Sequence, residues 1–140
     1  MEIFELMINV RPLLVLLVAT LLLVGCAPSG PPMYTVTGTV TFDGQPVAAG
    51  DILFRDATGQ TRSYAGKIVN GEYSFESSPG SKIVEISAMR DVPGKVDTSN
   101  PGEEVPLREQ YIPAVYNTET TLTADISADS RSADFSLTSD

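Results

Sequence analysis

The sequence predicts an all-β fold, a seven-stranded antiparallel Greek-key β-sandwich, from three observations. Short runs after residue 33 alternate apolar and polar side chains with a period of two, which is typical of strands that bury one face. Turn-forming pairs such as Asn70-Gly71 and Pro79-Gly80 separate these runs. No segment after Cys26 has a helical period. Frequent turns between short strands indicate a small sandwich.

Alternating side chains predict the first two strands. The inward positions of the first run are Tyr34, Val36, Gly38, Val40 and Phe42. Threonines alternate with them, and β-branched residues suit the solvated face of a strand. Asp43-Gly44 ends this run, and we expect Pro46 to keep the next few residues out of a ladder. Ile52 and Phe54 mark the inward face of the second strand.

The third and fourth strands are predicted to form a tight hairpin. Asn70-Gly71 supplies the two positive φ angles of a type I′ turn. Tyr73 and Phe75 form the inward pair on the return strand. The inward face of the third strand stays open between two sets: Gly66 and Ile68, or Ala65, Lys67 and Val69.

Three more strands complete the predicted sandwich. The inward residues of the fifth strand are Val84, Ile86 and Ala88; those of the last two are Leu122, Ala124 and Ile126, then Phe135 and Leu137. Two apolar residues, Ile83 and Met89, fall on the solvated face of the fifth strand. We expect the segment that follows to cover them.

Residues 91–110 show no period and are predicted to be a long loop, which in a compact domain is usually functional or disordered. Tyr111 and Tyr116 follow, with apolar neighbours of the kind that recognise a sugar or a peptide. Two interpretations stay open. The aromatic segment closes the open side of the sandwich, which we favour, or Tyr111 and Tyr116 bind a ligand together with the loop.

An apolar run from Leu13 ends in Leu23-Val24-Gly25-Cys26, which resembles the lipobox of bacterial lipoproteins. In that family the cysteine thiol is alkylated by diacylglycerol, carrying acyl chains such as palmitate, and the chain is cut before it. The resemblance implies a signal peptide (1–25), a lipidated Cys26 with a short tether (26–32) and a sandwich domain (33–140). The run of about 12 residues is shorter than the roughly 20 that a spanning helix needs. Whether Met1 or Met7 is the true start stays open.

Charge and residue inventory argue against several function classes. The chain has 18 acidic and 9 basic residues, and loss of residues 1–25 removes two glutamates and one arginine, so the net charge of −9 becomes −8. An acidic domain has no basic footprint for nucleic acid. Histidine is absent and Cys26 is the one cysteine, so the usual general base, nucleophile and zinc ligands are missing. We therefore expect no enzymatic activity, no catalytic residues, no metal and no cofactor.

The turn and strand motifs resemble the carboxypeptidase regulatory-like, or transthyretin-like, domain over roughly residues 34–138. The matching segments run from Gly38 to Val47 and from Asn70 to Phe75, followed by Pro79-Gly80 before Val84-Glu85-Ile86. Residues 112–117, followed by Leu122-Thr123, are similar to small bacterial envelope lipoproteins that carry this domain. The resemblance implies a prealbumin-like sandwich used as an accessory module. It implies no activity, because the family's catalytic partners have no counterpart in this chain.

Two functional hypotheses follow. The first, which we prefer, is a non-catalytic lipoprotein that is attached to a membrane of the bacterial cell envelope through its lipid and acts as a structural or protein-interaction module. The second is a carbohydrate- or small-ligand-binding module that uses residues 91–116. Ala27 is not the acidic residue associated with inner-membrane retention, which favours the periplasmic side of the outer membrane. Whether the chain forms homo-oligomers stays open.

Overall fold

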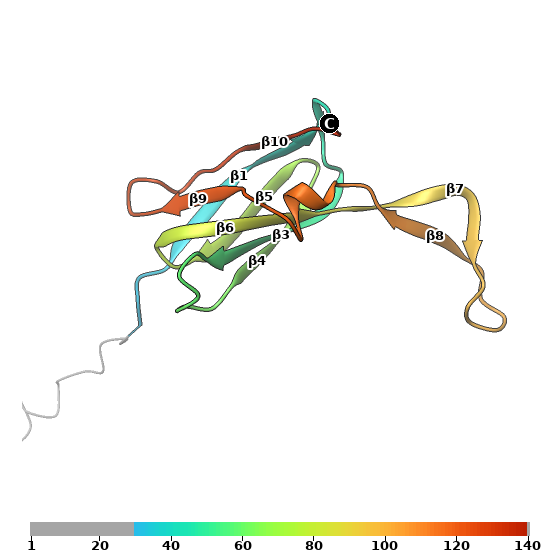
Figure 1. The fold of residues 1–140 in the computed structure, drawn as a ribbon, viewed down its shortest axis with the longest axis horizontal. Helices are drawn as coiled ribbons and strands as arrows, with labels where there is room; N and C mark the ends of the chain where they lie inside the picture. The colour runs from blue at the N-terminus through green and yellow to red at the C-terminus, as the bar shows by residue number, and fades with distance from the viewer. Residues whose placement is uncertain (1–29, 140) are drawn as a thin grey trace, which may run out of the picture. The chain divides into compact units, whose positions relative to one another are not determined.

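The computed structural model describes residues 30–139, and the chain from Pro31 onward forms a compact unit. This unit is nearly all β (Figure 1). Its strands are β1 (Tyr34–Phe42), β2 (Gln45–Pro46), β3 (Ala49–Asp56), β4 (Tyr64–Val69), β5 (Glu72–Ser77), β6 (Gly80–Ser87), β7 (Met89–Asp97), β8 (Val105–Gln110), β9 (Thr123–Ile126) and β10 (Phe135–Leu137). A 3₁₀ turn, η1 (Ala114–Tyr116), lies between β8 and β9.

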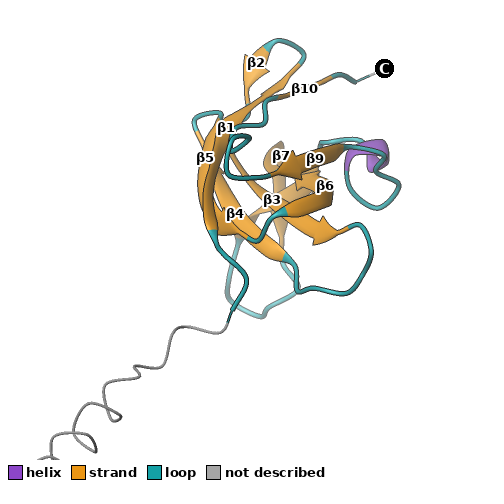
Figure 2. Cartoon of the chain, turned by 90° about the vertical axis from the view of Figure 1, so that its left-hand side faces the viewer, coloured by secondary structure: helices purple, strands orange, loops and turns teal. Residues whose placement is uncertain are grey.

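The predicted all-β sandwich is confirmed, and its seven expected strands form one hydrogen-bonded path. The order along the path is β10-β1-β5-β4-β3-β6-β9, with β2 paired to β1 beside it. The strands β3, β4 and β5 are successive neighbours, and β6 returns to lie beside β3, which is a Greek key. The sheet curls around a single core as a half-barrel (Figure 2). The ribbon of β7 and β8 stands apart as a second, two-stranded sheet.

The core forms on the inward parity of each predicted strand. Every second residue of a strand faces the same side, so one apolar set per strand is enough to fill the interior. The buried apolar residues are Val36, Val40, Val47, Ile52, Phe54, Ile68, Tyr73, Val84, Ile86, Ala88, Ile112, Ala124, Ile126, Phe135 and Leu137. The open choice in β4 is settled for Gly66 and Ile68, since Ile68 is buried and Val69 is exposed. A Cβ on Gly66 would lie 2.4 Å from the Phe75 ring, so a side chain there would displace that ring.

Two hairpin turns set the register of the sheet. Asn70 and Gly71 both have positive φ angles, 52° and 79°, as the predicted type I′ turn requires. Asp43 and Gly44 adopt the same pair of signs, 49° and 79°. These turns place Val69 opposite Glu72 and Phe42 opposite Gln45.

The structure corrects two expectations about the ladder. Gln45 and Pro46 do pair with β1, as the short strand β2. Pro46 has no amide hydrogen to donate, and the next backbone hydrogen bond runs from the Val47 amide to the Val40 carbonyl oxygen, at 3.0 Å. The sheet is also not wholly antiparallel. After β9 the chain crosses to the free edge of β1 and runs alongside it, so that β10 pairs in parallel with Val40 opposite Phe135.

Candidate functional site

The predicted long loop at residues 91–110 is instead an antiparallel ribbon of β7 and β8, which projects from the sandwich (Figure 1). Its base is fixed to the body, because the Gln110 side-chain oxygen accepts a hydrogen bond from the Ala88 amide at 3.0 Å. The register breaks between Asp91 and Val96, where the strand bulges around Pro93-Gly94. That bulge and Pro106 hide the period of two in the sequence.

Each face of the ribbon carries one ion pair near its base. Arg90 lies opposite Glu109, with 2.8 Å between the guanidinium and the carboxylate, and Asp91 lies opposite Arg108 at 3.4 Å. Alternation separates the two faces. The register puts Arg90 and Glu109 on one face, together with Asp97 and Val105. Alternation from these residues adds Leu107 and Lys95, and we call this side the Leu107 face. The opposite one is the Val96 face: Met89, Asp91, Val96, Pro106, Arg108 and Gln110.

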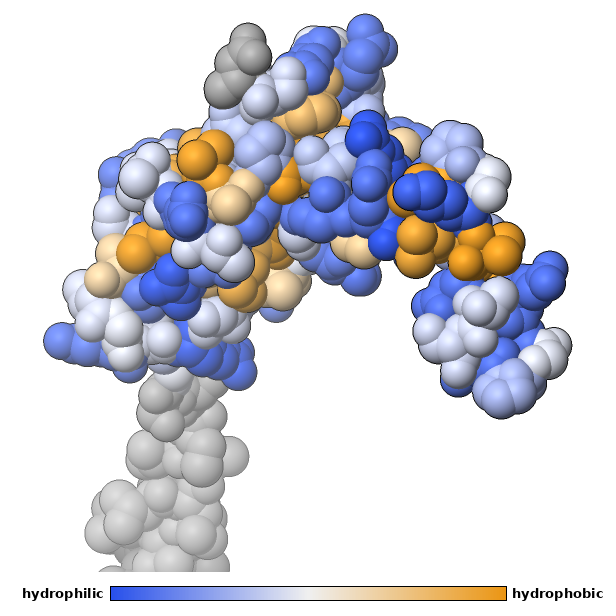
Figure 3. All heavy atoms as spheres, turned by 45° about the vertical axis from the view of Figure 1, so that its right-hand side comes forward, coloured by the Kyte–Doolittle hydropathy of each residue, from blue (hydrophilic) through white to orange (hydrophobic). Residues whose placement is uncertain are grey.

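Large apolar side chains on this ribbon remain in solvent. Exposed fractions are 53% for Val96, 48% for Val105, 43% for Met89 and 36% for Leu107. The space-filling view shows apolar residues gathered on the projecting ribbon, before its polar tip (Figure 3). Met89 was expected to be covered, but the following segment leads away from the body instead. This ribbon is the feature that sequence analysis missed.

Tyr111 is half-buried and packs against the core. Its ring meets Phe42 edge-on, with 5.5 Å between ring centroids, and the Arg90 guanidinium lies 5.5 Å from the ring centre. The backbone amide of Tyr111 donates to the Ala88 carbonyl oxygen at 3.1 Å. Ile112, the next residue, is buried in the core.

Tyr116 is held at a different place, at the end of η1. Its hydroxyl accepts a hydrogen bond from the Thr138 amide at 3.2 Å and lies 3.2 Å from the Thr138 hydroxyl. These contacts, the hydroxyl first, lower the pKa of Tyr116. Asn117 locks the same turn, because its side-chain amide donates to the carbonyl oxygens of Ile112 and Pro113. The two tyrosines therefore contact separate neighbours and do not line one common site.

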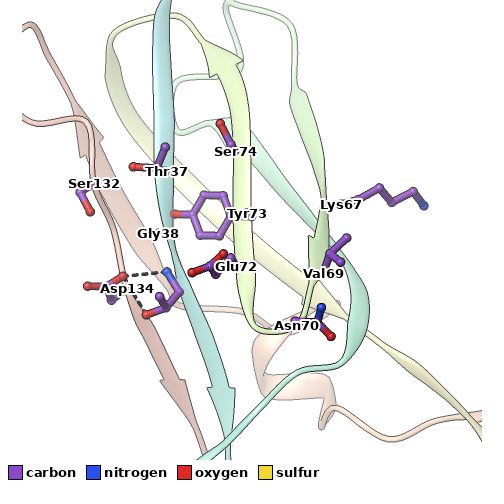
Figure 4. A pocket seen from close by; sticks show the side chains of 11 residues that line it. Thr37, Gly38, Lys67, Val69, Asn70, Glu72, Tyr73, Ser74, Ser132 and Asp134 are labelled. Atoms are coloured by element: carbon purple, nitrogen blue, oxygen red, sulfur yellow. Dashed lines mark hydrogen bonds between the residues drawn. The ribbon is translucent and has the colours of Figure 1, made fainter.

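A shallow groove of about 690 Å³ crosses the outer face of β1, β5 and β4 (Figure 4). Its lining residues are Thr37, Gly38, Thr39, Lys67, Val69, Asn70, Glu72, Tyr73, Ser74, Ser132 and Asp134. Asp134 forms one wall and is fixed there, because its carboxylate accepts hydrogen bonds from the Thr39 amide at 2.7 Å and hydroxyl at 2.9 Å.

Beneath the groove, Tyr73 ties the sheet to the segment before β10. The Tyr73 hydroxyl donates to the Ala133 carbonyl oxygen at 2.6 Å, and a Cβ on Gly38 would lie 1.9 Å from that oxygen. Burial, with a smaller effect of Asp134, raises the pKa of Tyr73 well above its usual value. The tyrosine ring thus belongs to the core, and the groove offers hydroxyl, amide and charged groups.

The body buries one lysine, Lys82, completely. Its ammonium donates to the Ser78 hydroxyl at 3.1 Å and lies 3.6 Å from the Asp56 carboxylate. The Thr58 hydroxyl, followed by the Gln60 amide, lowers the pKa of Asp56 from 3.8 to about 2. Because Lys82 and Ser78 are buried, this cluster ties the ends of β3 and β6 together rather than facing a substrate.

Several predictions fall outside the structure. Cys26 and the lipobox residues Leu23, Val24 and Gly25 precede the described residues. Within residues 30–139, no three histidine, cysteine, aspartate or glutamate side chains are grouped as metal ligands would be. The same residues contain no helix that is both long and apolar enough to cross a bilayer.

Comparisons with known proteins give a distant structural likeness. No family model and no curated sequence matches the chain. A 9R-lipoxygenase from Cyanothece PCC8801 aligns with a TM-score of 0.36 at 16% identity, covering 81% of this chain and 18% of that one. A DUF3823 family protein from Parabacteroides merdae aligns with a TM-score of 0.36 at 15% identity, covering 78% and 45%. The chain thus spans less than half the length of either protein.

Proposed function

We propose that this chain is a non-catalytic, lipid-anchored protein of the bacterial cell envelope that binds a protein partner through the β7–β8 ribbon. The observation that carries the proposal is the exposure of Met89, Val96, Val105 and Leu107 on an arm that projects from the body. Full burial of one such side chain is worth about 1.5–3 kcal/mol. An isolated two-stranded ribbon is only marginally stable in water, so a partner would also order it.

The anchor in this proposal is Cys26, with the sandwich held near its membrane by the short tether. Acyl chains suit an acidic protein, because its own charges are repelled by anionic lipid. We also propose that the domain belongs to the carboxypeptidase regulatory-like class. In support, the motif residues Asp43-Gly44 and Asn70-Gly71 form hairpin turns, and Tyr73 and Phe75 point inward.

Ligand binding at Tyr111 and Tyr116 has less support, because both side chains pack within the domain. A glycan array on the intact protein provides the check. A glycan signal that Tyr111→Ala and Tyr116→Ala abolish, without loss of folding, would count against the protein-interaction proposal.

Photo-cross-linking in intact cells tests the partner. We expect a benzophenone amino acid at Leu107 to give a discrete protein adduct of higher mass. The matched control is Glu76, which is exposed on the outer face of β5. Equal adducts at the two positions, or none at Leu107, would contradict the ribbon proposal.

Metabolic labelling with an alkyne-tagged fatty acid tests the anchor. Label should enter the wild-type chain and be lost in Cys26→Ser, which should also move to the soluble fraction. An unlabelled wild-type chain with its leader intact would refute the lipid anchor.

A further inference from the structure

We propose that the partner of the ribbon is a second copy of this chain, bound Leu107 face to Leu107 face. This inference rests on the proposed function, because it names the occupant of the same surface. Three features support it: the layout of the apolar residues, the charges around them, and the poor suitability of the ribbon edges and tip for other contacts.

The Leu107 face has the more continuous apolar patch. Val105 and Leu107 are two residues apart on β8, so their side chains are neighbours on one face. Val92, two residues after Arg90 and half-buried, adds to the same side. On the Val96 face, Val96 lies opposite Pro106, and Met89 is separated from this pair by seven positions of β7 and by the bulge. A flat contact therefore has more continuous apolar surface on the Leu107 face.

The charged residues on the Leu107 face of one copy are complementary to those on the same face of a second copy. The face carries Arg90 and Glu109 near its base, and Lys95 and Asp97 near its tip. It is therefore neutral, on a chain whose net charge is −9 and whose copies repel each other elsewhere. In a twofold contact every pair of residues occurs twice. Antiparallel ribbons would place Arg90 of one copy near Asp97 of the other, and Lys95 near Glu109.

The edges and the tip fit other contacts less well. Strand addition to the ribbon is hindered by the bulge at Pro93 in β7 and by Pro106 in β8, because neither proline can donate to a new ladder. The turn beyond the strands, residues 98–104, is polar and carries Glu103 and Glu104. An anionic bilayer repels such a tip.

The membrane supplies the concentration that so small a contact needs. Stable interfaces bury about 800 Å² on each partner. Within the described residues, the large exposed apolar side chains of the Leu107 face are Val105 and Leu107 alone. Chains tethered to the same bilayer meet at a high effective concentration, which favours weak contacts. The dimer is therefore expected on the membrane and should weaken when the protein is diluted in detergent.

Disulfide trapping in intact cells tests the inference. The described residues contain no cysteine, so Leu107→Cys places one thiol on the proposed contact. Val96→Cys, on the opposite face of the same ribbon, and Val69→Cys, on the body, are matched controls with 53% and 58% exposure. After mild oxidation, we expect a reducible dimer at Leu107 at least fivefold more abundant than at either control. Unchanged thermal unfolding of each variant would verify that it folds.

Two differently tagged copies in one cell identify the occupant. Co-purification of both tags in the Leu107→Cys dimer supports the second copy, and trapping equal at all three positions overturns it. If the photo-adduct at Leu107 contains a different protein and no disulfide dimer forms, the ribbon function stands and the second-copy inference fails. If neither product forms, both fail.

Discussion

At the scale of single residues, the buried ion pair explains how a small domain without a disulfide in its described part fixes one end of its sheet. Lys82 reaches Asp56 and Ser78 from within the core, and Asp56 is held in turn by Thr58 and Gln60. Removing one partner of a buried pair leaves the other charge uncompensated. Lys82 on β6 lies directly opposite Asp56 on β3. The ion pair can therefore form only when these two strands are in their native register.

The stability of the fold should depend on the protonation of Asp56. Its pKa is about 2 in the folded chain against an ordinary 3.8, so the ionised carboxylate stabilises the fold above about pH 4. That contribution is lost as the pH falls toward 2. We expect Asp56→Asn to lower the free energy of unfolding at pH 7 and to flatten its decline between pH 4 and 2, as measured by urea unfolding. Asp97→Asn is the control, because the lowered pKa of Asp97 belongs to the ribbon; an equal effect of both variants would contradict the assignment.

At the scale of elements, alternation and turn chemistry predicted the seven main strands of the body, but not the short strand β2 or the parallel pairing of β10 with β1. The inward sets of six strands followed directly from the period of two, because only one face of each strand is buried. In β4 each parity contains a large apolar residue, Ile68 in one and Val69 in the other, and only packing against Phe75 and the core decides between them. The ribbon was missed because a bulge breaks its period and its apolar residues face solvent rather than a core. No local signal distinguishes such a strand from a proline-rich loop.

Substitutions at the two hairpin glycines, Gly44 and Gly71, would distinguish the free-energy cost of a left-handed backbone from the cost of a steric clash. Gly71 and Gly44 share a φ of 79°, but a Cβ on Gly71 would lie 2.7 Å from the Pro46 Cβ, whereas one on Gly44 meets nothing within 4 Å. We expect Gly44→Ala to destabilise by about 1–2 kcal/mol, the cost of the left-handed backbone. Gly71→Ala should cost about 1–3 kcal/mol more, because of overpacking. Equal losses of unfolding free energy would show that the Pro46 contact relaxes freely.

At the scale of the whole molecule, the proposed function gives the body and the ribbon separate tasks. The body holds the core; its outer surface is mostly polar, with Val69 and Val115 as its exposed large apolar side chains. The ribbon adds little to that core and carries exposed apolar groups instead. We interpret the body as a support that positions the arm. Function is the part that the sequence leaves open, because an interaction surface has no residue signature comparable to a catalytic motif.

Shortening the ribbon should leave the body intact. Replacing residues 91–108 with Asn-Gly would join the paired residues Arg90 and Glu109 through a two-residue turn. We expect the thermal unfolding midpoint of the body to be unchanged within about 4 °C, which corresponds to less than about 1 kcal/mol. A much larger fall, measured by calorimetry, would mean that the ribbon stabilises the fold and is not a separate arm.

The parallel pairing of β1 with β10 also affects the order in which the sheet can be completed during folding. The Thr39 amide donates a hydrogen bond to the Asp134 carboxylate, 95 residues later in the chain. The outer edge of β1 therefore has no hydrogen-bond partners until the last segment of the chain is present. Such distant pairing slows folding. A chain leaving the ribosome would therefore lack this edge of its sheet until nearly all of it had been synthesised.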